Sequence, residues 1–176
     1  EAANIVQKVT IIPRGDAGGY NLMTPKEDTM LSTKSELEAQ ICGLLGGRVA
    51  EELVLNEIST GATNDIERAT KIAQAMVSSF GMSSLGPIQY SREDGNVFLG
   101  RDYTTNKSNS EKVATEIDEE VRKIVDKAYK QAQEIIGKHR KELDDIVDAL
   151  LEHETLTKED LDNIVKYGTK DAPVEQ

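Results

Sequence analysis

The chain has 176 residues, of which 32 are acidic and 21 are basic, so its formal net charge at pH 7 is −11. Its lysines and arginines are scattered among carboxylates, and such a surface repels phosphate backbones, which argues against a nucleic-acid-binding protein. A hydrophobic content of 38% supports a folded core and excludes a disordered chain.

The length suits one domain, or one domain with an appended helical piece. The single cysteine cannot cross-link the fold and is typical of a reducing compartment, and two histidines are too few for an ordinary histidine-rich metal site. No apolar run approaches the ~20 residues that span a bilayer, and the first residues lack the features of a signal peptide. We therefore expect a soluble chain, and because it begins with Glu1 rather than methionine we expect a piece of something larger.

The first third of the chain predicts mixed structure. Val6–Ile12 is β-branched and apolar, which predicts a strand that Pro13 ends. Residues 14–19 are rich in glycine and typical of a turn, and Tyr20–Met23 predicts a second strand that completes a hairpin. Residues 26–31 are predicted to form a loop.

Two helices are predicted to follow the hairpin. Thr33 and Glu36 have the spacing of a capping box, in which the hydroxyl and the carboxylate satisfy each other's backbone amides. Apolar residues behind them recur at helical spacing to about residue 55. After a loop, Asn64 and Glu67 give a second capping signature at the start of another helix.

Gly81 is expected to end that second helix. Residues 82–109 predict irregular structure, with a short strand at 97–99. From Ser110 onward, apolar residues mark one face of a long helix, which Gly137 is expected to interrupt.

The C-terminal part continues with helices. The apolar pattern resumes from Leu143 to Leu151, and Thr157 with Asp160 is expected to cap a last short helix that Gly168 closes. The chain is therefore predicted to be mainly α and to consist of a compact region, 1–105, and a helical region, 106–168, followed by a flexible tail, 169–176.

Several residues that could carry chemistry have plainer structural explanations. Cys42 lies in an apolar helix, where a free cysteine is usually an inert core residue. His139 and His153 do not have the spacing of helical metal ligands and are expected to be solvated. Each glycine of the pair Gly46-Gly47 costs a helix about 1 kcal/mol relative to alanine, which predicts close packing of another element at this point.

Carboxylates near the two predicted helix ends are the remaining candidates. Asp65 follows a loop of small hydroxyl and glycine residues, and spacing alone makes it an ordinary residue of a first helical turn. Adjacent carboxylates on a helix point about 100° apart, so only one of Glu51 and Glu52 could face inward, and it would need a partner. From the residues alone, both are expected to be solvated.

Six blocks of residues together form a family pattern. In this order, the sequence resembles the peptidase domain of the FtsH family of membrane-anchored, ATP-dependent zinc proteases, from about Gln7 to Val165. The resemblance implies a helical metallopeptidase domain with a β-hairpin or edge strand near its N-terminus, in which 1–105 is the remainder of the zinc peptidase core and 106–168 a C-terminal helical subdomain. The blocks are Lys8–Gly15, Gly18–Tyr20, Leu44–Glu52, Ser59–Thr70, Phe80–Met82 and Val97–Arg101.

The resemblance implies a zinc mechanism in which this chain holds one ligand. Family members bind zinc through two histidines of an H-E-x-x-H helix, whose glutamate is the general base, and through an aspartate that matches Asp65. The fourth position holds the water that zinc activates. A carboxylate on the preceding helix supports the site; Glu51 is the preferred match, and Glu52 stays open.

The H-E-x-x-H motif does not occur in this sequence. The resemblance places it just before Val6–Ile12, so the general-base glutamate is expected upstream and no catalytic residue is assigned in this chain. We therefore expect the chain alone to bind zinc weakly or not at all and to hydrolyse nothing.

The resemblance implies that the chain is part of the zinc metalloendopeptidase domain of an ATP-dependent membrane protein quality-control protease, which degrades unfolded or unassembled proteins with zinc-activated water. The resemblance implies extended polypeptide substrates, which could add to an edge of the first strands, and a homo-hexamer. It also implies ATP use through an ATPase module absent from this sequence, and a place on the cytoplasmic side of a bacterial inner membrane or in an organelle. The alternative is a non-catalytic helical scaffold or oligomerisation module with the same fold.

Overall fold

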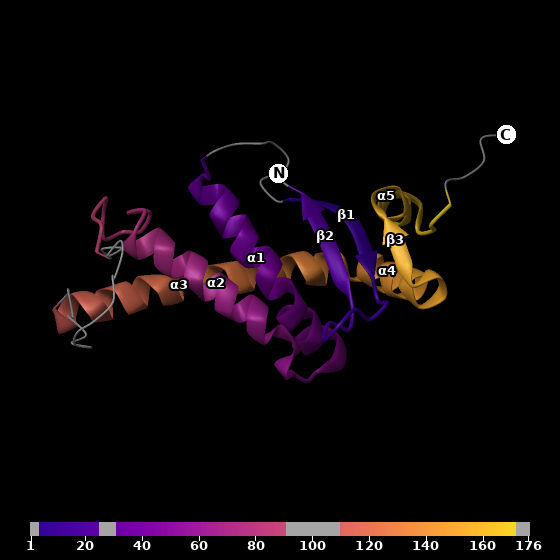
Figure 1. Ribbon diagram of the computed structural model, residues 1–176, viewed down its shortest axis with the longest axis horizontal. Helices are drawn as coiled ribbons and strands as arrows, with labels where there is room; N and C mark the ends of the chain where they lie inside the picture. The colour runs from indigo at the N-terminus through magenta and orange to yellow at the C-terminus, as the bar shows by residue number, and fades with distance from the viewer. Residues whose placement is uncertain (1–3, 25–30, 91–109, 172–176) are drawn as a thin grey trace. The chain divides into compact units, whose positions relative to one another are not determined.

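The computed structural model describes residues 4–24, 31–90 and 110–171. The described part is mainly α, as predicted, with a small sheet (Figure 1). In chain order, the elements are β1 (Ile5–Thr10), β2 (Tyr20–Thr24), α1 (Lys34–Ala50), the π-helix η1 (Glu51–Leu55), the 3₁₀ helix η2 (Thr60–Ala62), α2 (Thr63–Ser78), α3 (Glu111–Lys138), α4 (Arg140–His153), β3 (Thr155–Thr157) and α5 (Lys158–Tyr167). None of the described helices is long and apolar enough to cross a membrane.

The sheet has the order β2-β1-β3, and both pairings are antiparallel. The hairpin of β1 and β2 confirms the prediction, whereas β3 was not predicted. Thr10 lies opposite Tyr20 on one side and Thr155 on the other. Strand β1 ends at Thr10 rather than at Ile12, because the Ile12 amide turns back to donate to the Thr10 hydroxyl at 3.2 Å.

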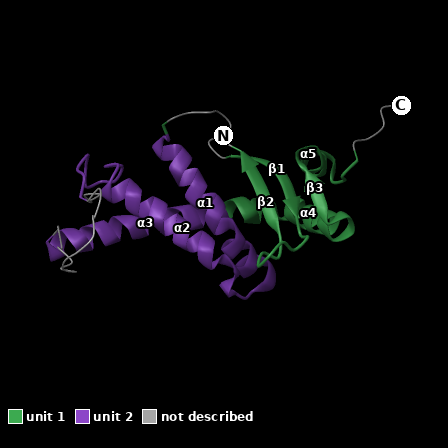
Figure 2. Cartoon of the chain, viewed as in Figure 1, with its two compact units in different colours: residues 1–31, 133–176 green, residues 32–132 purple. Residues whose placement is uncertain are grey.

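The described residues fall into two compact units, Glu1–Leu31 with Gln133–Gln176 and Ser32–Ala132 (Figure 2). These units are defined by which residues lie close together in space. The division at residue 105 follows the order of the sequence and stays a prediction about subdomains.

The core of the first unit lies between the sheet and the two C-terminal helices. Leu150, Leu156 and Ile164 are buried, and Val9 packs against them. Helix α5 begins as predicted, because Thr157 and Asp160 form a capping box, and it ends at Gly168 with φ 77°. Because Val9 and Leu156 face this core, the alternate residues of β1 and β3 lie on the opposite face of the sheet.

The core of the second unit lies between α1 and α2. The Thr33–Glu36 capping box starts α1 as predicted, with the Thr33 amide 2.7 Å from the Glu36 carboxylate. The buried side chains of the two helices are Leu37, Ile41, Cys42, Leu45, Val49, Ala69, Ala73, Met76 and Val77.

Helix α3 also holds the segment that follows α2. Glu120 is only 7% exposed and accepts hydrogen bonds from the Ser84 amide at 3.2 Å and from Lys123 at 2.6 Å. These bonds, that of Lys123 first, lower the pKa of Glu120. One buried carboxylate thus ties Ser84 to α3. The segment around it, residues 82–90, lacks regular structure as predicted.

Two predicted helix boundaries are wrong. Helix α2 begins at Thr63, and its cap residue Ala62 makes no side-chain bond, so Asn64 lies inside the first turn instead of capping it. Gly137 lies within α3, and the break comes at His139, whose φ of −108° and ψ of 31° depart from helical values. A glycine weakens a helix by only about 1 kcal/mol, which neighbouring packing can offset.

Two further predictions concern glycines and a strand. An added Cβ at Gly46 or Gly47 would meet no atom within 4 Å among the described residues, so the close packing predicted there is absent from the described part of the chain. The strand predicted at 97–99 lies outside the described residues.

Candidate metal-ligand site

Asp65 is placed in the first turn of α2. Its side chain is 45% exposed and lies 3.9 Å from Arg68, one turn along the helix. A carboxylate at this position is favoured by the free amides and the dipole of the helix N-terminus. Because the ion pair is long and exposed, it holds the carboxylate weakly, and Asp65 keeps oxygen atoms accessible to another cation.

Glu51 anchors the loop that leads to Asp65. It begins the π-helix η1, and its carboxylate accepts from the Ser59 hydroxyl at 2.5 Å and from the Ser59 amide at 3.2 Å. The two bonds from Ser59 lower the pKa of Glu51. The Ser59 hydroxyl in turn accepts from the Gly61 amide at 3.1 Å and caps η2, so Glu51 fixes the turn directly before α2.

Glu52 faces a different partner. Its carboxylate accepts a hydrogen bond from the phenol of Tyr129 on α3. Burial and this carboxylate raise the pKa of Tyr129 to about 12. Glu52 is exposed and Glu51 is half-buried, so neither is removed from water, but each has a hydrogen-bond partner that the sequence did not predict.

Sequence reasoning missed Ser59 and Tyr129 as the partners of these carboxylates. Ser59 lies 8 residues from Glu51 and Tyr129 lies 77 residues from Glu52. The first contact depends on the turn after a π-helix and the second on how two helices pack. Neither leaves a spacing in the sequence that could have identified it.

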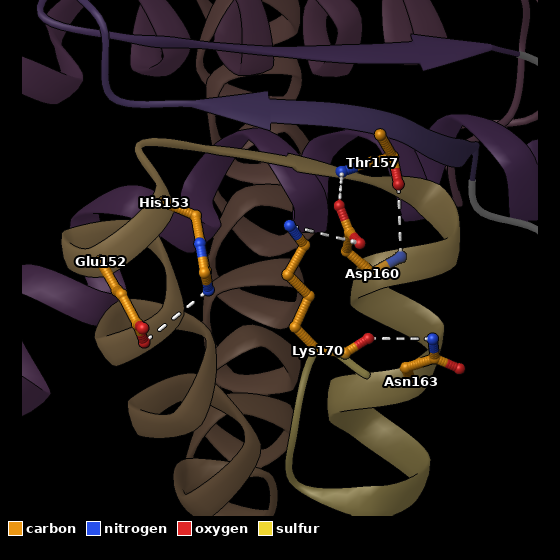
Figure 3. A network of polar contacts seen from close by, with 6 residues as sticks. All are labelled: Glu152, His153, Thr157, Asp160, Asn163 and Lys170. Carbon is orange, nitrogen blue, oxygen red and sulfur yellow. Dashed lines mark hydrogen bonds and ion pairs between the residues drawn. The ribbon is translucent and has the colours of Figure 1, made fainter. Parts of the chain in front are cut away.

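Each histidine has a carboxylate neighbour close to it in the sequence. His139 contacts Glu142 at 3.1 Å, and His153 lies 3.7 Å from Glu152 at the end of α4. Figure 3 shows His153 turned towards Glu152, while Asp160 is held by Thr157 and Lys170. Cys42 is buried, as predicted for a core residue, and burial raises the pKa of its thiol.

The donor set within the described residues does not complete a zinc site. No group of three histidine, cysteine, aspartate or glutamate side chains in the described ranges could hold a metal ion. A catalytic zinc takes three protein ligands and an open position, and Asp65 is the one ligand predicted among these residues. No catalytic step follows from these residues alone.

Comparison with known proteins identifies the family to which this chain is similar. The model of Peptidase family M41 matches residues 1–164. The ATP-dependent zinc metalloprotease FtsH of Acholeplasma laidlawii is 53% identical over 166 residues, which cover 94% of this chain and 26% of that protein. The ATP-dependent zinc metalloprotease FtsH of Bacillus subtilis is 48% identical over 171 residues, covering 96% of this chain and 27% of that protein.

The chain thus spans about a quarter of the length of the curated relatives it matches. The matches cover the hairpin, the α1–α2 pair with Asp65 and most of the C-terminal helices, and they confirm the resemblance to the FtsH peptidase domain. The chain belongs to peptidase family M41.

Proposed function

We propose that this chain is part of the zinc metalloendopeptidase domain of a longer ATP-dependent protease, in which Asp65 supplies one zinc ligand. The accessible carboxylate of Asp65, at the end of an anchored turn, is the observation that carries this proposal. In the longer protein, the two histidines and the general-base glutamate come from an H-E-x-x-H helix. Zinc, when bound, supplies the activated water.

Within this site, Glu51 is the supporting carboxylate. Its bonds to Ser59 fix the turn before Asp65, whereas Glu52 bonds to Tyr129 on another helix. Groups that orient a metal ligand typically change metal affinity or activity by about 10- to 100-fold when they are removed. The contact with the turn that leads to Asp65 therefore favours Glu51 over Glu52.

The substrates are extended or unfolded polypeptides. Within the described sheet, β2 pairs only with β1, so its outer edge offers amides and carbonyls to an added strand. Main-chain pairing of this kind accepts many sequences, which suits a protease that degrades unfolded proteins. The whole protein forms a homo-hexamer, uses ATP through a separate module and is anchored in a membrane, on the cytoplasmic side of a bacterial inner membrane or in an organelle.

The test is a pair of substitutions in the longer protein that contains this chain. Asp65→Asn should reduce both zinc content, measured by atomic absorption, and casein hydrolysis to background. Glu51→Gln should reduce activity by about 10- to 100-fold. Asp126→Asn, an exposed residue on α3, is the matched control and should leave both unchanged.

The same experiment separates the peptidase from the scaffold. An Asp65→Asn protein with full zinc content and full activity would remove Asp65 from the site. A longer protein that neither holds zinc nor hydrolyses casein in its unmodified form would favour the non-catalytic helical scaffold.

A further inference from the structure

A pocket opens on the face of the sheet opposite the buried core of the first unit. Val9 and Leu156 point into that core, and the residues on either side of them in the strands point the other way. The pocket has a volume of about 190 Å³. Its walls include Lys8, Thr10 and Tyr20 of the hairpin, Thr155 of β3, and residues 12–14 of the connection between β1 and β2.

The pocket is locally basic in an acidic protein. Lys8 and Arg14 both line it, and no carboxylate does. The chain as a whole carries a net charge of −11, yet within the described residues no ion pair neutralises either cation. Lys8 lies over the ring of Tyr20, with its nitrogen 5.9 Å from the ring centre. Two cations beside apolar and aromatic walls favour an anionic group.

The walls of the pocket are held by their own hydrogen bonds. Arg14 and Ala17 exchange two backbone bonds of 2.9 and 3.2 Å, which close the turn that carries Arg14. The hydroxyls of Thr10 and Thr155 lie 2.8 Å apart. Gly19 passes so close to β1 that an added Cβ would lie 2.5 Å from the Thr10 carbonyl oxygen. The backbone is therefore preorganised, which lowers the entropy lost when a ligand binds.

We propose that this pocket binds a carboxylate presented by an extended polypeptide that pairs with the outer edge of β2. Tyr20 is both the first residue of β2 and part of the pocket wall, so a strand added to this edge passes beside the pocket. The planar guanidinium of Arg14 matches a carboxylate better than a point charge does, and the volume accommodates one acidic side chain or a chain terminus. The inference deepens the proposed function, because the polypeptide is its substrate.

The test is peptide titration of the isotope-labelled chain, followed by NMR. Three acetylated hexapeptides of threonine and valine are compared: one with a central glutamate and an amidated end, one with glutamine and an amidated end, and one with glutamine and a free terminal carboxylate. We expect a peptide with a carboxylate to bind about tenfold more tightly than the uncharged one. The two charged peptides distinguish an acidic side chain from a chain terminus as the group that is bound.

Substitutions assign the effect to the pocket. Arg14→Gln should abolish the preference for the charged peptides, and Lys8→Gln should reduce it. The matched controls are Lys166→Gln, whose lysine also lies over a tyrosine ring at 4.7 Å, and Arg122→Gln on the exposed face of α3. Both controls should keep the preference.

Equal affinity of the unmodified chain for all three peptides would overturn the proposal, as would a preference that survives Arg14→Gln. Peptide binding at β2 without a charge preference would remove the carboxylate pocket and leave strand addition intact. The zinc measurement on Asp65→Asn is independent of these results, so failure of this inference and failure of the proposed function remain distinguishable.

Discussion

Ser59 is the residue through which Glu51 acts on the loop before Asp65. Its hydroxyl donates to Glu51 and accepts from the Gly61 amide. Because this side chain bonds on both sides, it links Glu51, which directly follows α1, to the turn before α2. The effect of the Ser59 hydroxyl can therefore be measured through the pKa of Glu51, without any zinc bound.

Replacing Ser59 by alanine should raise the pKa of Glu51 towards its ordinary value. The hydroxyl bond from Ser59 is the largest cause of the lowered pKa, followed by the bond from the Ser59 amide. Carbon-detected NMR titration of the Glu51 side chain measures the change directly. Glu67, whose pKa is lowered by Lys71, is the internal control and should not shift.

The same substitution has a defined pH dependence. Because the folded pKa of Glu51 is lowered, its bonds stabilise the protein at pH values above the unfolded pKa, and this stabilisation is lost as the pH falls through the folded pKa. Ser59→Ala should therefore unfold more readily than the unmodified chain near neutral pH, with the gap closing in acid. A gap that is independent of pH would contradict the role given to Glu51.

Only part of the candidate site could be predicted from the residue types and their spacing. Asp65 and Glu51 could be named only through the family resemblance, since spacing alone makes Asp65 an ordinary residue of a helical turn. Their predicted roles in zinc binding await the tests above. The bond between Glu52 and Tyr129 could not be predicted, because it depends on the relative rotation of two helices.

Among the elements, β3 shows why a short strand escapes sequence analysis. It has three residues, and its last residue, Thr157, also caps α5. The capping signal was recognised, whereas a strand of this length has no period of its own to detect. It forms because β1 offers a free edge and because Leu156 fills the core beneath it. The predicted hairpin and the capping boxes of α1 and α5 are confirmed, because their signals are local.

Leu156→Ala should therefore lower the free energy of unfolding far more than the position of Leu156 in a three-residue strand suggests. The side chain is completely buried, and truncating a buried leucine typically lowers the free energy of unfolding by about 2–5 kcal/mol. Leu151→Ala is the matched control, since Leu151 is 71% exposed and a surface change should stay within about 0.5 kcal/mol. Urea unfolding followed by circular dichroism measures both, and equal losses would show that β3 is not part of the core.

At the scale of the whole molecule, the histidine count says more about a metal site than the net charge says about binding partners. The −11 charge describes an acidic surface that nevertheless contains a basic pocket beside β2, so a total over the chain conceals local chemistry. The two histidines argue more directly. Each has a carboxylate neighbour close to it in the sequence, and no group of three possible metal ligands occurs in the described part of the chain. The described residues therefore bring one predicted metal ligand to the site.

The chain alone should consequently bind zinc weakly or not at all and should not hydrolyse casein. One carboxylate cannot replace the three protein ligands of a catalytic zinc, and its attraction for a cation in water is screened by solvent and salt. Isothermal titration calorimetry with zinc and a casein assay on the same sample test both statements. If a tight complex with one zinc per chain appears, Asp65→Asn and a double substitution of His139 and His153 by asparagine decide which residues hold it. Tight binding that Asp65→Asn abolishes would show that the chain completes its own site, contrary to the division of ligands proposed above.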